Sequence, residues 1–369
     1  MKLFKYLFFL LLIVIIGGAI YVATLDNDFR VEKSKKMAVP NVLAFEEVNN
    51  YKNWENWDPR IANDQNISFA LSEKTIGEGA TYSWESSTYN DGKYETTEVI
   101  PNNSIKQKYS FDTTFGKAEK EMNWVFTTEN DSTKVIWTIE GKRNFWEKLA
   151  MLIDDQSSEE KFAPMLENGL DNIEKSILKK METFSINVDG VTRHSGGFYL
   201  YSSTSSRSDS KMLGEKMAEI LPTIHRFMVD NNIPINGAPL TVYNEINEMN
   251  NSVIISPGIP TNSRIITPTD SNILCGFLPA QPVLKTTLKG DYKNLSAAWT
   301  TAEEYLNQNN LMKDMSADPF EVYVTDPATN PNPAAWVTEI YIPILEEKPT
   351  TTKDPVSAQE NSPLEETQM

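Results

Sequence analysis

Two segments in the second half of the chain follow the same pattern, which limits the folds open to it. Residues 239–261 and 319–345 both run Pro-x-x-Val-Tyr, then a polar turn, then an apolar stretch that closes on Ile-Pro. The matching tyrosines, Tyr243 and Tyr323, lie 80 residues apart, and the closing Ile-Pro pairs lie 83 residues apart. This spacing predicts a duplicated unit, the alternative being a chance likeness of common strand motifs. Paired units of this size usually enclose a cleft, where a binding site is expected.

The residues ahead of each repeated segment predict a strand and then a helix. Apolar residues spaced i, i+4, i+7 and i+11 mark the two helices: Leu213, Met217, Ile220 and Ile224, then Leu295, Trp299, Ala302 and Leu306. Asp209 or Ser210 can cap the first helix, and Pro222 is expected to kink it or move its start. Asn pairs at 231–232 and 309–310 predict left-handed caps at both helix ends. With strand-like runs over 198–201 and 282–288, each unit is expected to fold as β-α-β-β.

The closing pattern carries a family resemblance. Residues 320–323, Phe-Glu-Val-Tyr, and 336–344, Trp-Val-Thr-Glu-Ile-Tyr-Ile-Pro-Ile, resemble the effector-binding domain of bacterial transcription activators, also called GyrI-like, over about 185–346. The resemblance implies a duplicated domain that binds small, often apolar or cationic molecules in the groove between its repeats. Some proteins that resemble it hydrolyse small electrophiles. No helix-turn-helix region is evident in the sequence, which argues against a DNA-binding regulator.

Residues 29–181 show a different order of elements. A strand over 29–38 is followed by a helix that starts at Pro40, the favoured first-turn position. Strands are expected over 79–89, 93–100, 104–111, 119–128 and 133–140, with Asn90-Asp91-Gly92 as a hairpin turn. A long helix with Leu166, Leu170, Ile173 and Ile177 at helical spacing comes last. The order predicts an antiparallel sheet wrapped around a final helix.

A second resemblance rests on this order and on residues 51–59, Tyr-Lys-Asn-Trp-Glu-Asn-Trp-Asp-Pro. The region 29–181 resembles the polyketide cyclase and dehydrase family, part of the START-related helix-grip (SRPBCC) group. The resemblance implies a cavity for an apolar ligand between the sheet and the helix, and it does not imply a cyclase reaction. Trp54 and Trp57 are expected to pack against the helix end rather than to touch a ligand. The fold class expected for the whole chain is therefore α+β.

The N-terminal segment predicts where the protein resides. Leu3 to Leu25 is apolar apart from Lys5 and Thr24, and at about 1.5 Å per residue it is long enough for a ~30 Å hydrocarbon core. We expect a single-pass transmembrane anchor over 1–26 of a bacterial protein, with the bulk on the non-cytoplasmic, periplasmic side, because a short lysine-bearing tail usually stays inside. A cleaved signal peptide is the alternative. Residues 347–369 are rich in Pro, Thr, Ser, Glu and Gln and are expected to be disordered.

Composition narrows the partners. A formal net charge of −17 and a pI of about 4.7 argue against nucleic acid, since no basic stripe is available to neutralise phosphates. Cys275 is the single cysteine and the chain has two histidines, so neither an internal disulfide nor a zinc or haem site is expected. No cofactor is predicted. The expected partners are a small apolar or cationic molecule and, through the N-terminal helix, a membrane.

One carboxylate is the first candidate for the binding site. Glu339 lies on the apolar closing strand, and a carboxylate that faces inward there must be paired or must meet a ligand. Alignment of the two Ile-Pro pairs puts Ser256 opposite it, so the cleft would carry one acid. Glu339 could hold a cation, accept a hydrogen bond or act as a general base. The alternative is that it points to solvent.

Aromatic side chains complete the predicted site. Tyr323, Trp299 and Tyr243 are candidate pocket walls, although Trp299 could equally be core. Glu321 shares a strand face with Tyr323, and Tyr341 shares one with Glu339. All six are predicted ligand-binding residues. Three functions stay open: capture of a small apolar or cationic molecule, which is favoured; hydrolysis of a small electrophile by Glu339 and Tyr323; and a structural or interaction module of the cell envelope.

Overall fold

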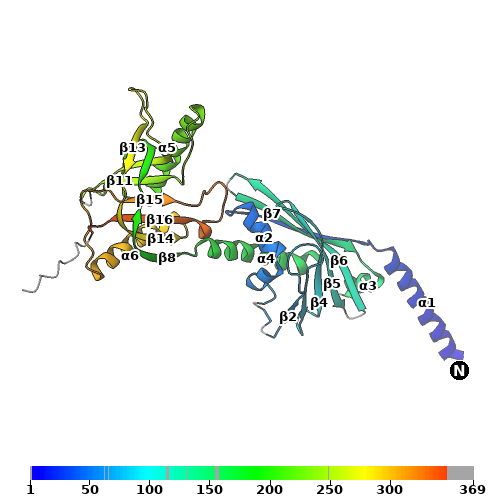
Figure 1. Cartoon of the computed structure of the whole chain (residues 1–369). Helices are drawn as coiled ribbons and strands as arrows, with labels where there is room; N and C mark the ends of the chain where they lie inside the picture. Colours follow the sequence, from blue (N-terminus) through cyan, green and yellow to red (C-terminus); the bar gives the residue numbers. More distant parts are fainter. Residues whose placement is uncertain are drawn as a thin grey trace, which may run out of the picture. The chain divides into compact units, whose positions relative to one another are not determined.

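A computed structural model describes residues 2–346, except 62, 65, 114, 115, 131, 154–157 and 248. The chain is mixed α+β, with two antiparallel sheets and one N-terminal apolar helix (Figure 1). It divides into two compact units. Unit 1 holds the residues up to 185 together with 288–295 and 324–338, and unit 2 holds the remainder. The predicted tail, 347–369, lies outside the described residues.

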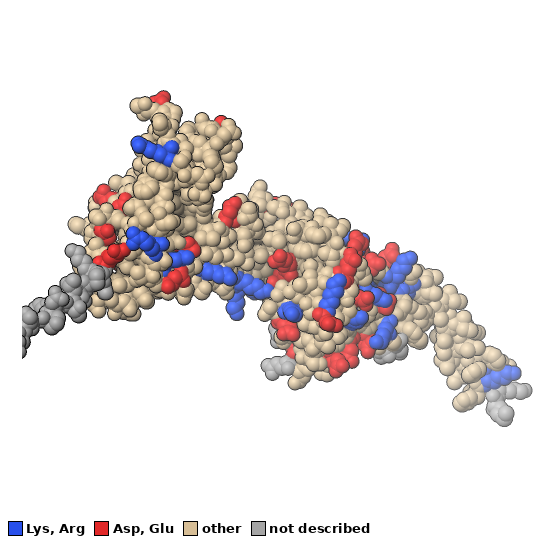
Figure 2. Space-filling model, viewed as in Figure 1, with Lys and Arg blue, Asp and Glu red and all other residues tan. Residues whose placement is uncertain are grey.

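The N-terminal helix α1 (Lys2–Thr24) is apolar on every side. Its span Leu3–Thr24 has a mean hydropathy of 2.7, and almost all of its side chains are exposed. Figure 2 shows it as a continuous surface without charge apart from its N-terminal end. By length and composition this helix could cross a membrane, and a signal sequence near an N-terminus would pass the same test.

Unit 1 is built on a seven-stranded antiparallel sheet. Its strands are β1 (Asp28–Met37), β2 (Ser68–Leu71), β3 (Thr81–Glu85), β4 (Gly92–Ile100), β5 (Ser104–Thr113), β6 (Gly116–Glu129) and β7 (Ser132–Lys142). The order across the sheet is β1-β7-β6-β5-β4-β3-β2, so the first strand returns to pair with the last. Between β1 and β2 stand α2 (Asn41–Asn49) and the 3-10 helix η1 (Tyr51–Asn56), and after β7 come α3 (Phe145–Ile153) and α4 (Ser158–Met181).

Alternation along the strands directs apolar side chains to one face, where α4 covers them. Leu166, Leu170, Ile173 and Ile177 of α4 are all buried, as their helical spacing predicts. Trp54 and Trp57 lie in the same core. Asn90 adopts the left-handed conformation in the turn between β3 and β4, which agrees with the predicted hairpin. The sequence reasoning did not predict β2 or α3.

Unit 2 is built on the second sheet. Its strands are β8 (Ser185–His194), β9 (Gly197–Tyr201), β10 (Thr204–Arg207), β11 (Leu240–Asn247), β12 (Ser252–Thr261), β13 (Leu274–Leu278), β14 (Gln281–Lys289), β15 (Phe320–Tyr323) and β16 (Val337–Pro343). They are ordered β13-β9-β12-β11-β15-β16-β14-β8, and β10 also pairs with β12. Its helices are α5 (Ser210–Asp230) and α6 (Leu295–Gln308), whereas the short η2 (Tyr292–Asn294) and η3 (Pro333–Ala335) fall in the ranges that belong to unit 1.

The order of elements contains two β-α-β-β runs, β9-α5-β11-β12 and β14-α6-β15-β16, interrupted by β10 and accompanied by β8 and β13. Asp209 caps α5, which runs from Ser210 to Asp230 with Pro222 inside it, so the proline does not move the start of the helix. Asn232 and Asn310 both have φ of 54°, which confirms the left-handed caps predicted at the two helix ends.

Candidate functional site

Glu321, on β15, is a carboxylate with no exposed surface. Its Oε1 accepts a hydrogen bond of 2.6 Å from Trp299 Nε1 on α6, and its Oε2 accepts one of 2.7 Å from the Tyr323 hydroxyl. The Tyr243 hydroxyl of β11 also bonds to this carboxylate. In the part of the chain that the structure describes, no lysine, arginine or histidine forms an ion pair with Glu321. The group is thus held by neutral donors alone.

Strand geometry brings these four side chains together. Thr241 of β11 lies directly opposite Glu321 of β15, so alternation places Tyr243 and Tyr323 on the same sheet face. The Thr241 hydroxyl donates to Met217 Sδ of α5 at 3.3 Å, and Trp299 comes from α6. The rings of Tyr243 and Trp299 meet edge to face, with centroids 5.4 Å apart. Both helices therefore cover the face that carries Glu321.

Electrostatics make this carboxyl unusual. Burial raises the pKa of Glu321 above its ordinary value, while the hydrogen bonds from Trp299, Tyr323 and Tyr243 act against that rise. Tyr323 is also buried, whereas Tyr243 and Trp299 are half-buried. The acid therefore lies at the base of an aromatic cluster whose outer members reach the surface. A cation at this position would find both a carboxylate and aromatic faces.

The structure places Glu339 in another network. Its Oε1 lies 2.7 Å from Lys285 Nζ on β14, and its Oε2 accepts a 2.5 Å hydrogen bond from Tyr341. Tyr341 stacks on Phe320 at 4.9 Å and meets His194 at 5.2 Å. Burial lowers the pKa of the His194 imidazole, and the Glu339 carboxylate opposes this. Glu339 is thus neutralised within the protein by a lysine.

The six predicted ligand residues therefore form two groups. Phe320 and Glu321 are neighbours on β15 and point to opposite faces. Since Tyr341 stacks on Phe320, Glu339 and Tyr341 lie on the face away from Glu321 and Tyr323. The expectation that Glu339 shares a groove with Tyr323 is wrong, and so is their pairing as joint catalytic residues. The ligand roles of all six residues stay predictions, with Glu321, Tyr323, Trp299 and Tyr243 brought together.

In unit 1 the space between the sheet and α4 is occupied by aromatic side chains. Trp54, Trp57, Trp124 and Trp137 are buried, and the rings of Trp124 and Trp137 stack at 4.1 Å. Beside them Asp58 and Arg60 form a buried ion pair, with Nε of Arg60 2.9 Å from Oδ1 of Asp58. This interior is packed by side chains, although the resemblance of 29–181 implied a cavity there.

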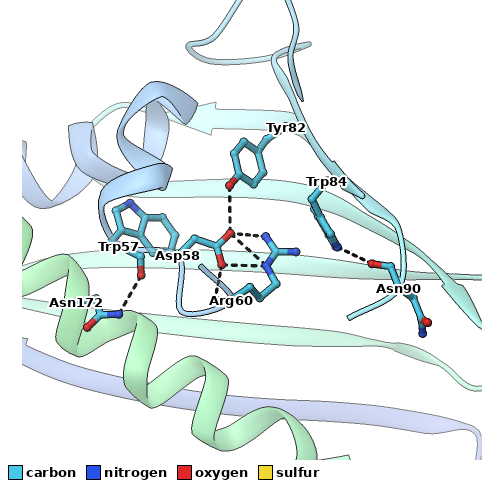
Figure 3. Close-up of polar contacts among 7 residues, drawn as sticks. All are labelled: Trp57, Asp58, Arg60, Tyr82, Trp84, Asn90 and Asn172. Atoms are coloured by element: carbon cyan, nitrogen blue, oxygen red, sulfur yellow. Dashed lines mark hydrogen bonds and ion pairs between the residues drawn. The ribbon is translucent and has the colours of Figure 1, made fainter. Parts of the chain in front are cut away.

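Figure 3 shows how the ion pair is enclosed. Tyr82 donates a hydrogen bond of 3.3 Å to Asp58, and the guanidinium of Arg60 lies 3.6 Å from the centre of the Trp84 ring. Trp84 in turn donates to the carbonyl of Asn90, and Asn172 of α4 donates to the carbonyl of Trp57. These contacts join the segment after η1 to β3 and α4. Asp58 and Arg60 therefore have a structural role, because their contacts hold this segment in place. The sequence did not indicate either residue as functional.

Surface grooves in unit 1 do not suit an apolar ligand. A groove of about 1000 Å³ is lined largely by charged side chains of β1 and of β4 to β7, including Glu98, Lys106 and Glu140. Another, of about 530 Å³, includes Asp91, Lys93 and Lys117. Charged walls of both signs are costly to desolvate against an apolar molecule.

Comparisons with known proteins bear on unit 2. The family of GyrI-like small-molecule binding domains matches residues 276–345, a range that includes Trp299, Glu321 and Tyr323. The comparison with curated proteins gives no sequence match. The family match at 276–345 supports the predicted GyrI-like resemblance over part of 185–346. The remainder of that range, and the START-related resemblance of 29–181, stay predictions.

Several solved structures are similar to parts of the chain. The EcmrR C-terminal domain is 16% identical, with a TM-score of 0.37, over 44% of this chain and 99% of its own. Protein Ms6760 from Mycobacterium smegmatis is 13% identical, with a TM-score of 0.31, over 41% of this chain and 91% of its own. The Aha1 dimer from Colwellia psychrerythraea is 13% identical, with a TM-score of 0.29, over 40% of this chain and 98% of its own.

Proposed function

We propose that the protein is a membrane-anchored binding protein that captures a small apolar or cationic molecule at Glu321. The observation that carries this proposal is a fully buried carboxylate with three neutral hydrogen-bond donors and, among the residues that the structure describes, no basic partner. Burying a carboxyl in this way disfavours its charged form. A cationic ligand would supply a positive charge beside the carboxylate and offset the free-energy cost of burying its charged form.

The aromatic residues support the same chemistry. Trp299 and Tyr243 are half-buried above the acid, so a ligand that displaced solvent there would contact two ring surfaces. Aromatic faces attract cations and bury apolar groups. GyrI-like domains bind small molecules, and the matched segment contains Glu321. These three lines favour a lipophilic cation over an anion or a polar neutral molecule.

The test is a binding measurement with a defined probe, tetraphenylphosphonium, on the full chain in detergent. Glu321→Gln keeps the shape and removes the charge, so the probe should bind more weakly by up to roughly 3 kcal/mol, the Coulomb attraction of two unit charges about 6 Å apart near a protein surface. Triphenylphosphine oxide, which is neutral, should be affected less. Glu339→Gln is the matched control and should leave the affinity unchanged. Equal affinity of the wild type and Glu321→Gln would remove Glu321 from the site.

We further infer a fold for each part of the body. The first strand of unit 1 pairs with the last, and α4 packs along β1 beneath the sheet, which supports a helix-grip domain related to the polyketide cyclases. The two β-α-β-β runs of unit 2 support a duplicated effector-binding domain. An experimental structure of each part, superposed on members of these families, tests both assignments.

The proposal places the body outside the cytoplasm. The support is the apolar span Leu3–Thr24, together with the lysines Lys2 and Lys5 on its N-terminal side. Intact-mass measurement of protein extracted from membranes separates an anchor from a signal peptide. A mass that includes residues 2–26 supports the anchor, and its loss supports cleavage.

A further inference from the structure

The short helix α3 (Phe145–Ile153) is oriented unlike an ordinary surface helix. Phe145, Trp146 and Leu152 are 39%, 46% and 49% exposed, whereas Lys148 is only 5% exposed. Helices of soluble domains bury their apolar stripe and expose their charges. Contiguous exposed apolar surface on a folded domain marks a site of interaction.

Hydrogen bonds and an ion pair hold the charged residues of α3, Glu147 and Lys148, against the rest of the protein. These contacts fix the orientation of the helix. Glu147 forms an ion pair of 2.7 Å with Lys120 of β6, whose side chain is only 2% exposed. Asn144 and Glu147 cap the start of the helix reciprocally, each donating its backbone N–H to the other's side chain at 2.8 and 2.9 Å. Turning α3 over to hide its apolar side would break these bonds and leave a buried lysine unpaired.

The position of α3 identifies the partner. It packs beside the C-terminal end of α1, as Figure 1 shows, and Lys148 Nζ donates a hydrogen bond of 3.3 Å to the carbonyl of Ala23. Val22 is only 3% exposed, in contrast to the rest of the apolar span. A bilayer crossed by α1 would therefore have its surface at the level of α3. Aromatic side chains prefer this interfacial depth, where one end is apolar and the other is wet.

We propose that α3 lies in the interface of the bilayer that α1 enters, with Phe145, Trp146 and Leu152 in contact with lipid. This inference rests on the proposed membrane anchor and goes beyond it, because two adjacent contacts with lipid would restrain the orientation of unit 1 on the membrane. Lys142, whose side chain is exposed, lies ahead of the helix and suits anionic headgroups. A lipid surface is favoured over a protein partner because the apolar side chains of α3 continue those of α1.

The test uses the full chain in vesicles of phosphatidylcholine and phosphatidylglycerol. In a Cys275→Ser background, single cysteines are introduced as Trp146→Cys or Leu152→Cys and labelled with an environment-sensitive fluorophore. Leu12→Cys, in α1, provides the lipid reference. Ile100→Cys, 47% exposed in unit 1 at the end of β4, provides the aqueous reference. All four sites are exposed, so the substitutions should not disturb folding.

The proposal expects labels at 146 and 152 to lose their emission to nitroxide-bearing lipids to an extent similar to the label at 12, while the label at 100 keeps its emission. Labels at 146 and 152 that behave like the label at 100, with 12 still quenched, would overturn the role of α3 and spare the anchor. A blue-shifted label at 146 that lipid nitroxides do not quench would show a protein contact and also overturn the proposal. Failure of quenching at 12 would overturn the anchor and this inference together.

Discussion

At the scale of single residues, Glu321 combines two properties that oppose one another. Its oxygens accept three hydrogen bonds, which lower the pKa of the carboxyl. Burial has the larger effect and raises this pKa above its ordinary value of 4.5. The folded state therefore holds the proton to a higher pH than the unfolded state does. Stability contributed by this group is lost as pH rises from about 4.5 to the raised folded pKa, because the folded state binds more protons over that window.

The direction of this pH dependence gives a testable prediction. The melting temperature of Glu321→Gln relative to the wild type should increase as pH rises from acid to neutral, and should level off once the wild-type carboxyl is ionised. Thermal unfolding followed by circular dichroism over a pH series measures it. Glu245→Gln removes an exposed carboxyl from β11 and controls for net charge. A difference between wild type and Glu321→Gln that is constant with pH would contradict the shifted pKa.

The buried pair in unit 1 gives a second prediction. Asp58→Asn leaves the Arg60 guanidinium buried without its counter-charge, which should destabilise unit 1 by about 3–5 kcal/mol. Glu95→Gln removes an exposed pair with Lys93 and should cost about 1 kcal/mol or less. Urea unfolding followed by tryptophan fluorescence measures both, since most tryptophans lie in unit 1. Equal costs would mean that the Asp58–Arg60 pair does not lock the segment after η1.

The sequence predicted part of the site at this scale. Alternation correctly placed Glu321 with Tyr323, and Tyr341 with Glu339. It could not tell which face of each strand the helices cover, because that depends on how β15 and β16 lie across the sheet. Glu339 was therefore put in the wrong group. Asp58 and Arg60 lie on a loop between η1 and β2, outside any periodic pattern. Their ion pair could therefore not be predicted from periodicity.

At the scale of elements, prediction succeeded where local chemistry decides the outcome. The asparagines after α5 and α6 adopt the left-handed cap that their position indicates. The long helix α4 buries its periodic apolar residues. It failed for α3, because a helix that exposes Phe145, Trp146 and Leu152 and buries Lys148 inverts the pattern used to recognise helices. It also missed β2, a four-residue strand with little room for a periodic signal.

Two helical glycines should respond oppositely to alanine. A Cβ at Gly169 of α4 would lie 2.5 Å from Cζ3 of the buried Trp137, so Gly169→Ala should destabilise unit 1 by about 1–3 kcal/mol. Gly214 of α5 has no neighbour within 4 Å of its Cβ position, and Gly214→Ala should stabilise unit 2 by about 0.5–1 kcal/mol. Chemical denaturation of the two variants measures both. Stabilisation by Gly169→Ala would show that α4 does not pack this closely on the sheet.

At the scale of the whole molecule, the fold places the apolar helix α1 directly ahead of β1. The basic residues that follow α1 are engaged within unit 1. Lys33 pairs with Glu167, Lys35 pairs with Glu174, and Arg30 pairs with Glu32. They therefore do not form a basic patch that would hold the folded body on anionic lipid. Charge counting near the span does not decide the orientation, because Lys2 and Lys5 precede the span and Arg30 and Lys33 follow it.

The proposed orientation puts the residues after about 26 on the non-cytoplasmic side. A protease added to intact spheroplasts should then remove the body, because the protease reaches only what lies outside the cytoplasmic membrane. A cytoplasmic marker enzyme that resists the protease shows that the cells are sealed. The same treatment of lysed cells shows that the body can be digested. Full protection of residues 30–369 in sealed spheroplasts, with digestion after lysis, would reverse the orientation and place Glu321 and its ligand in the cytoplasm.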